Sequence, residues 1–172
     1  MPIPPGYLNA TRNFEKFLVD ARNESDLNTT NMAWNMVVGV LQVFRRRLDV
    51  EDAMRFSNML PPGIRSLFVA DWDLGEERRP FEDVATMTAE VKSLRAAHNF
   101  SPDSAIRDVA AALRRNVDEP AFDELLSTLS PEARAYWSVD ANPDDSSDET
   151  GRERMIESEV ATRGSVEPEV RD

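Results

Sequence analysis

The 172-residue sequence contains no cysteine, a single histidine and only six glycines. The lack of cysteine excludes disulfides, thiolate metal ligands and cysteine nucleophiles. One histidine is too few for zinc sites of the familiar type. The glycines never form a phosphate-binding loop, and no serine stands in a Gly-x-Ser-x-Gly turn. We therefore predict no catalytic residues, no cofactor and no metal site, and an enzyme is not the expected function.

Long apolar runs are also missing. No segment has the uninterrupted apolar length that a membrane span requires. The first residues, Met1 to Gly6, lack the basic start and the apolar run of a secretory signal. A chain without cysteine also suits a reducing compartment. These observations predict a cytoplasmic protein that does not bind a membrane.

Positive charge is scarce, because 20 lysines and arginines stand against 32 acidic residues, a net charge of −12. The stretch from Asp140 to Asp172 carries eleven acidic and four basic residues, a net of −7, which leaves −5 for the other 139 residues. Both parts repel phosphate groups at long range. We therefore predict a protein partner of unspecified identity rather than nucleic acid.

The clearest pattern that is present is an internal repeat, which is typical of duplicated folds. Residues 37–68 align with residues 106–137 at a constant shift of 69, without a gap. The identical pairs are Val40 with Val109, Arg45 with Arg114, Arg46 with Arg115, Asp49 with Asp118, Leu60 with Leu129, Pro62 with Pro131 and Arg65 with Arg134. The alignment predicts a duplicated domain.

Apolar residues recur at helical spacing in both copies. The first copy has two such stripes, Phe14 to Ala21 and Ala33 to Leu48, and the second has Val84 to Leu94 and Ile106 to Val117. No run alternates in the manner of a strand. We predict an all-α fold, in which two tandem pseudo-repeats of about four helices each pack into one helical domain.

The predicted organisation has five parts. An N-terminal extension (1–10) precedes helical repeat 1 (11–72), a linker (73–81), helical repeat 2 (82–139) and a C-terminal tail (140–172). The linker is assigned from Gly75 and the charged residues up to Pro80. The acidic tail has too few apolar residues to offset the entropy of ordering it, so disorder is predicted there.

Several residues carry helix-boundary signals. Asp49 and Asp118 are placed to cap the helices that follow them. Ser101-Pro102 and Ser130-Pro131 each put a capping hydroxyl before a proline, which predicts a helix start. For His98, capping the end of a helix is preferred over catalysis, because no orienting partner is visible near it in the sequence.

One set of packing and turn residues runs through the first copy: Phe17-Leu18, Leu41 to Leu48, Leu60-Pro61, Arg65, Leu67-Phe68 and Trp72. The second copy keeps Arg134 and Tyr136-Trp137 but has Leu129-Ser130 in place of Leu-Pro. This pattern resembles the bacterial domain of unknown function 2267 family over Phe14 to Trp137. The resemblance implies a helical, duplicated fold without an assigned reaction, and it provides no catalytic residues.

The arginines at the ends of the two long helices are the main candidate site, and they comprise Arg45, Arg46, Arg47, Arg114 and Arg115. One interpretation is structural, because cations complement the C-terminal end of a helix dipole and their stems cover apolar neighbours. The other is that the two helix ends form a patch that binds an anion or an acidic segment of a partner or of the chain's own tail.

Two further candidates involve apolar residues. In the tail, Met155, Ile156 and Val160 have the spacing of a short helical edge that folds against a partner, although chance gives the same spacing. Trp34, Trp72 and Trp137 fit core packing, or a hydrophobic ligand pocket between the copies.

The predicted function is a non-catalytic helical interaction or regulatory module with an unknown biochemical role. The first alternative is a binder of a small hydrophobic ligand between the repeats. The second alternative is a carboxylate-based enzyme without a recognisable motif, because carboxylates on different helices can meet in space.

Overall fold

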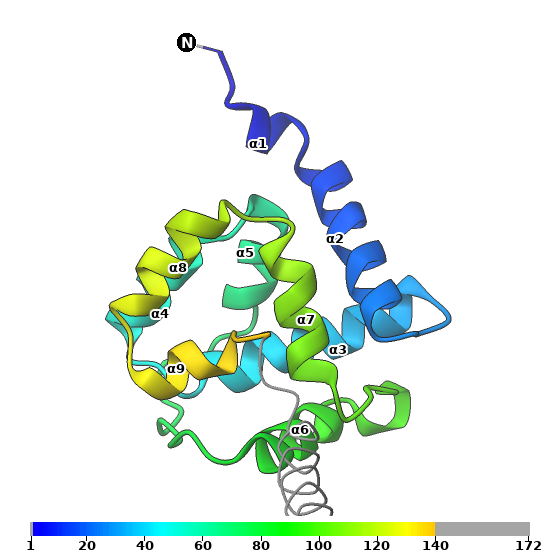
Figure 1. Cartoon of the computed structure of the whole chain (residues 1–172), viewed down its shortest axis with the longest axis vertical. Coiled ribbons are helices and arrows are strands. Elements are labelled where there is room, and N and C mark those ends of the chain that lie inside the picture. Colours follow the sequence, from blue (N-terminus) through cyan, green and yellow to red (C-terminus); the bar gives the residue numbers. More distant parts are fainter. Residues whose placement is uncertain (1, 140–172) are drawn as a thin grey trace, which may run out of the picture. The chain divides into compact units, whose positions relative to one another are not determined.

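The computed structural model describes residues 2–139, and within this range the chain is helical, without a strand (Figure 1). The elements are α1 (Pro5–Leu8), α2 (Ala10–Glu24), α3 (Thr30–Arg45), α4 (Val50–Met59), α5 (Pro62–Val69), α6 (Val84–Ser93), the 3-10 turn η1 (Ala96–His98), α7 (Ala105–Arg114), α8 (Glu119–Ser127) and α9 (Pro131–Tyr136). The predicted all-α class is confirmed for the described part of the chain.

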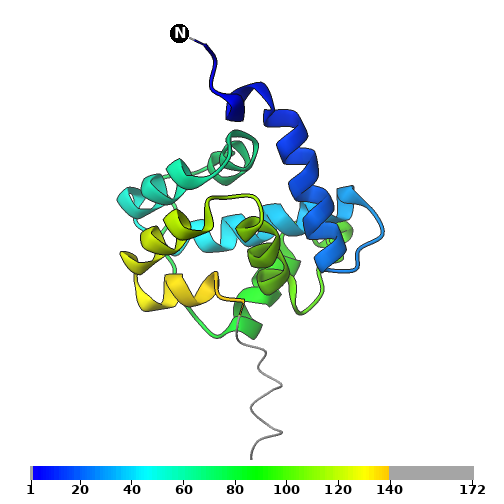
Figure 2. The same cartoon turned by 45° about the horizontal axis from the view of Figure 1, so that its top comes forward.

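Helix α3 lies at the centre of the fold because apolar residues occupy most of its circumference. Nine of its sixteen residues are buried, whereas α2 buries only Phe17, Leu18 and Ala21 on one face. A helix that is apolar on most sides is stable only between neighbours. Accordingly, α2, α5, α6 and α7 all pack against α3 (Figures 1 and 2).

The capping signals predict three of four helix starts correctly. Asp49, Asp118 and Ser130 each accept a hydrogen bond from the backbone N–H three residues later. The prediction for Ser101 is wrong, because α7 begins only at Ala105 and the Ser101 hydroxyl donates to the side chain of Asn99. A capping hydroxyl before proline therefore predicts a start only where the following residues are free to become helical.

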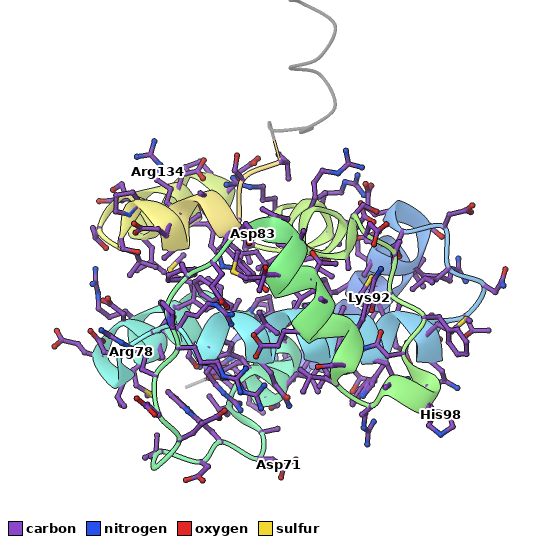
Figure 3. The ribbon with its side chains drawn as sticks, turned by 90° about the horizontal axis from the view of Figure 1, so that it is seen from below. Asp71, Arg78, Asp83, Lys92, His98 and Arg134 are labelled. Carbon is purple, nitrogen blue, oxygen red and sulfur yellow. The ribbon has the colours of Figure 1, made fainter. Side chains whose placement is uncertain are left out.

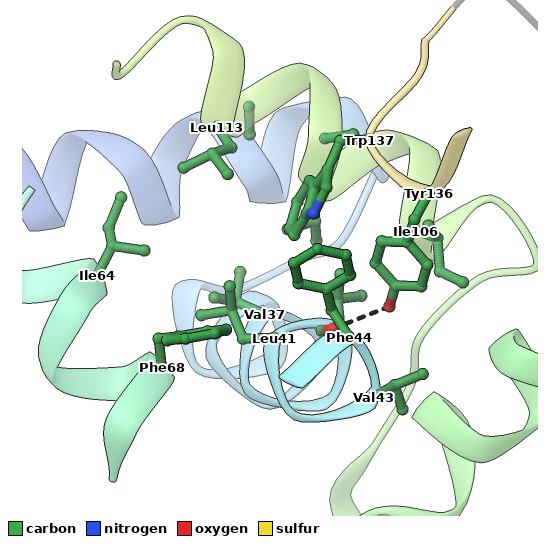
Figure 4. Close-up of a cluster of buried hydrophobic side chains, with 14 of the residues drawn as sticks. Val37, Leu41, Val43, Phe44, Ile64, Phe68, Ile106, Leu113, Tyr136 and Trp137 are labelled. Atoms are coloured by element: carbon green, nitrogen blue, oxygen red, sulfur yellow. Dashed lines mark hydrogen bonds between the residues drawn. The ribbon is translucent and has the colours of Figure 1, made fainter. Parts of the chain in front are cut away.

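Buried apolar residues from both predicted copies form one cluster. At its centre, Phe44 of α3 contacts Phe56, Tyr136 and Trp137 with ring centroids 4.8–5.2 Å apart (Figure 4). The Tyr136 hydroxyl donates a 2.8 Å hydrogen bond to the Val40 carbonyl oxygen, and burial raises the pKa of this phenol well above its usual value. The phenol therefore stays protonated and joins α9 to α3 inside the core.

Candidate functional site

The segment between α5 and α6, residues 70–83, is called the connecting segment here. It runs past the C-terminal end of α3, where the Arg79 amide donates a 2.9 Å hydrogen bond to the Arg46 carbonyl oxygen. The last carbonyls of a helix have no partner within it. The connecting segment therefore satisfies one of them and is positioned by it.

Arg45 anchors the start of the connecting segment. Its side chain is buried, and one guanidinium nitrogen, Nη1, donates to the carbonyl oxygens of Phe68 at 2.6 Å and Ala70 at 3.0 Å. The guanidinium carbon also lies 5.3 Å from the centre of the Trp72 ring, within the range of a cation–π contact. Trp72 is thus held beside the end of α3.

Glu90 of α6 is the hub of a charge cluster at the same place. Its carboxylate accepts from Arg46 at 3.1 Å and from Arg47 at 2.8 Å, and it pairs with Arg79 at 3.1 Å. Glu76 and Glu82 add one ion pair each, to Arg46 at 2.9 Å and to Arg47 at 3.1 Å. We call these six residues the Glu90 network. It joins the end of α3, the connecting segment and α6.

The arginines predicted as a binding patch have partners within the chain. Arg45 and Arg47 are only 3% and 4% exposed, and the Arg47 guanidinium also donates to the Val43 carbonyl oxygen at 2.8 Å. At the end of α7, Arg114 donates to the Trp137 carbonyl oxygen and pairs with two carboxylates, and Arg115 pairs with Glu24. These contacts favour the structural interpretation, and anion or partner binding by this set stays a prediction.

Two grooves flank the connecting segment. The larger, about 530 Å³, is the Phe81 groove. Its lining comprises Arg47, Leu48, Asp49, Asp52, Arg78, Arg79, Pro80, Phe81, Ser130 and Glu132. The smaller, about 360 Å³, is the Trp72 groove. Its lining comprises Arg45, Arg46, Leu48, Asp49, Val50, Trp72, Asp73, Leu74, Glu76, Glu77 and Arg78.

Arg78 differs from the other arginines at this corner of the fold. It lines both grooves and is exposed, and within residues 2–139 it forms no ion pair (Figure 3). Two apolar side chains of the Trp72 groove are also exposed, Val50 by 51% and Leu74 by 67%. Apolar side chains that are exposed next to one another in a groove make it a candidate surface for binding another molecule.

A comparison with protein families matches residues 14–136 to the uncharacterized conserved protein DUF2267. The chain belongs to the DUF2267 family. The match includes the residues of both grooves and all five arginines of the predicted patch. It confirms the resemblance derived from the packing and turn residues, and it brings no assigned activity. A search of curated proteins found no match.

The predicted tail contacts lie outside the structure. Met155, Ile156 and Val160 follow both the DUF2267 match and the described residues. Within residues 2–139, the helices fall short of the length and hydropathy needed to span a bilayer. In the same range, no three acidic or histidine side chains are grouped closely enough to hold a metal ion.

The prediction for His98 is wrong. Helix α6 ends at Ser93, and the side-chain amide of Asn99 donates to the carbonyl oxygens of Val91 and Leu94. Asn99 therefore occupies the capping role, and His98 lies exposed in η1, on the opposite side of the view in Figure 3 from Arg78. Asparagine tolerates turns and has two amide donors, so it fits this position better than an imidazole.

Asp108 of α7 is the one acidic side chain in the core of the described chain. Burial raises its pKa, although the Ser104 hydroxyl donates to it at 2.6 Å and the Arg107 guanidinium lies 3.5 Å away. Glu24 raises its pKa further. No described groove includes it, so it is a buried titratable group outside the candidate site.

Replacing Asp108 by asparagine is expected to stabilise the protein at pH 7, because burial disfavours the charged carboxylate and the amide carries no charge. With a raised pKa, the folded state binds more protons than the unfolded state between their two pKa values, so stability falls as pH rises through that window. Urea unfolding at pH 7 and near pH 4 measures this. The gain of Asp108→Asn should shrink at the lower pH, and a constant loss at both pH values would contradict the prediction.

Proposed function

We propose that the chain is a non-catalytic helical interaction module of the cytoplasm, which binds a protein partner through the corner where α3, α4 and the connecting segment meet. The observation that carries this is the Trp72 groove, where the exposed side chains of Val50 and Leu74 flank the half-buried Trp72. Tryptophan is enriched among residues that dominate binding energies at protein interfaces. We call residues 45–52 and 72–81 together the corner surface.

The proposal includes the tandem duplication, which several matched features support. Four helix boundaries coincide when the chain is shifted by 69 residues. They are the ends of α2 and α6, the ends of α3 and α7, the starts of α4 and α8, and the starts of α5 and α9. A residue with a left-handed backbone follows α2 and α6 at the same position of the alignment. These residues are Asp26, with φ of 52°, and Arg95, with φ of 56°.

Equivalent side chains also make equivalent bonds. Arg45 donates to the Phe68 carbonyl oxygen and Arg114 to that of Trp137, each 23 residues later. Asp49 and Asp118 cap α4 and α8 in the same way. These bonds support a structural role for the repeated arginine in each copy. The proposed site combines the end of α3 and the start of α4 with the connecting segment, which lies outside the aligned blocks.

The alternatives fit this surface less well. Charged side chains form most of the lining of both grooves, which disfavours a purely hydrophobic ligand. Asp108, the carboxylate whose pKa is raised by burial, lies outside both grooves, so neither groove pairs it with a second carboxylate for acid–base chemistry. The acidic tail with Met155, Ile156 and Val160 stays a separate prediction for partner binding.

Affinity purification with the full-length chain tests the proposal. The double variant Val50→Ser/Leu74→Ser changes two side chains that are already exposed, and its matched control is Val84→Ser/Phe100→Ser, whose targets are 58% and 59% exposed elsewhere on the surface. We expect a protein captured by the wild type to be reduced at least about tenfold with the corner variant and retained by the control. Equal capture by all three chains would refute the corner surface as the binding site.

A further inference from the structure

We infer that the Trp72 groove binds a partner segment that carries an apolar side chain flanked by lysine or arginine. This inference rests on the proposed function and adds the chemistry of the partner. It is drawn from the apolar floor of the groove and from the sign of the charges that remain without a partner at its rim.

The floor of the groove is apolar and is held in shape. Leu48 is buried, Trp72 is fixed between the Arg45 guanidinium and the Phe68 ring, and Val50 and Leu74 stay exposed at its edges. A volume of about 360 Å³ is at the small end of the range of about 300–1,000 Å³ typical of ligand pockets. Such a site accommodates one large apolar side chain of a peptide.

The rim is acidic once internal pairs are removed. The buried Arg45 guanidinium donates to backbone carbonyl oxygens, and Arg46 pairs with Glu76 and Glu90. Both arginines therefore offer little charge to a ligand. Glu77 forms no ion pair within residues 2–139. Asp49 and Asp73 accept backbone hydrogen bonds, and neither forms an ion pair in the described part of the chain.

Three exposed carboxylates thus stand against one exposed cation without an ion pair among the described residues, Arg78, at the rim of the Trp72 groove, because Arg45, which also lacks a carboxylate partner there, is buried. Asp71, exposed just before Trp72, adds a further negative charge (Figure 3). The residues before Asp140 together carry −5. This potential attracts a cationic segment and repels an acidic peptide or nucleic acid, because complementary potentials favour association.

Three synthetic peptides probe the groove in the full-length chain. The first alternates lysine or arginine with leucine, the second has glutamate at each basic position, and the third has serine at each leucine. The NMR signals of the Val50 and Leu74 amides and of the Trp72 indole N–H report binding. We expect shifts at these positions with the first peptide only, which weaken as salt is added.

Two charge changes at neighbouring exposed residues give opposite predictions. Glu77→Lys should weaken binding of the basic peptide at least about tenfold, whereas Arg78→Glu should strengthen it several-fold. Glu124→Lys, an exposed position on α8, is the matched control and should change affinity less than about twofold. Equal effects of Glu77→Lys and Glu124→Lys, or preference for the acidic peptide or an oligonucleotide, would overturn the inference.

The two proposals fail in different ways. If the partner captured by the wild type is lost with Val50→Ser/Leu74→Ser but is bound better by Glu77→Lys, the corner surface holds a partner of the opposite charge, and only the inference about partner chemistry is wrong. If neither change affects capture and the basic peptide leaves the groove signals unmoved, the proposed binding site and the inference are both wrong.

Discussion

Replacing Glu90 by alanine is expected to lower the free energy of unfolding by about 3–5 kcal/mol. The Glu90 side chain is 11% exposed and balances Arg47, whose side chain is fully buried, together with Arg46 and Arg79. Removing the carboxylate leaves a buried guanidinium whose charge is poorly compensated, since Glu82, its other partner, is 44% exposed. Desolvated charges without a partner are among the most costly changes in a folded protein.

Urea unfolding of full-length variants measures this effect. Glu90→Gln keeps an oxygen that accepts hydrogen bonds and should cost less than Glu90→Ala, because only the charge is lost. Glu82→Ala removes one exposed pair to the same arginine and should cost less than about 1 kcal/mol. A loss for Glu90→Ala as small as that for Glu82→Ala would show that the Glu90 network contributes little to stability.

The sequence predicts where the arginines lie but not which groups their side chains contact. The predicted repeat aligns Arg45 with Arg114, and their position at the ends of α3 and α7 is confirmed. Their hydrogen-bond partners lie 23 residues further along the chain, at carbonyl oxygens that carry no sequence signal. A run of arginines therefore indicates a helix end, whereas tertiary packing decides whether the guanidinium groups face inward or outward.

Glu90 itself had no signal in the sequence. It is one acidic residue in a helix of ordinary composition, 43 positions after Arg47, and only the packing of α6 on α3 brings the two together. The grooves were missed for the same reason. Residues of the connecting segment were predicted as a linker from Gly75 and the charged residues after it, but the sequence does not show that this segment crosses the end of α3.

The helices themselves follow from local rules. The apolar stripes predicted α2, α3, α6 and α7, and the aspartate caps predicted the starts of α4 and α8, because spacing and capping act within a few residues. The failures at Ser101 and His98 both occur between α6 and α7, where the Asn99 side chain bonds to two carbonyl oxygens and to Ser101. A single competing side chain there overrides both predicted signals.

Gly39 of α3 has no side chain, and Val91 of α6 packs closely against it. Replacing Gly39 by alanine is therefore expected to destabilise the protein by about 1–3 kcal/mol. Alanine in a helix interior is normally better than glycine by about 1 kcal/mol. At this position, however, an added Cβ would lie 2.9 Å from Cγ1 of Val91 and 3.1 Å from its carbonyl oxygen. Val91 is fully buried, so neither atom has room to move away.

A double-mutant cycle separates the two contacts at Gly39. Val91→Ala removes the methyl group that the new Cβ meets first, so the double variant Gly39→Ala/Val91→Ala should be more stable than the sum of the single changes by about 1 kcal/mol. Gly6→Ala is the control, because a Cβ there has no neighbour within 4 Å. If Gly39→Ala unfolds at a higher urea concentration than the wild type, the gain in helix propensity outweighs the clash with Val91. The prediction that close packing of α6 against α3 requires a glycine at this position would then be wrong.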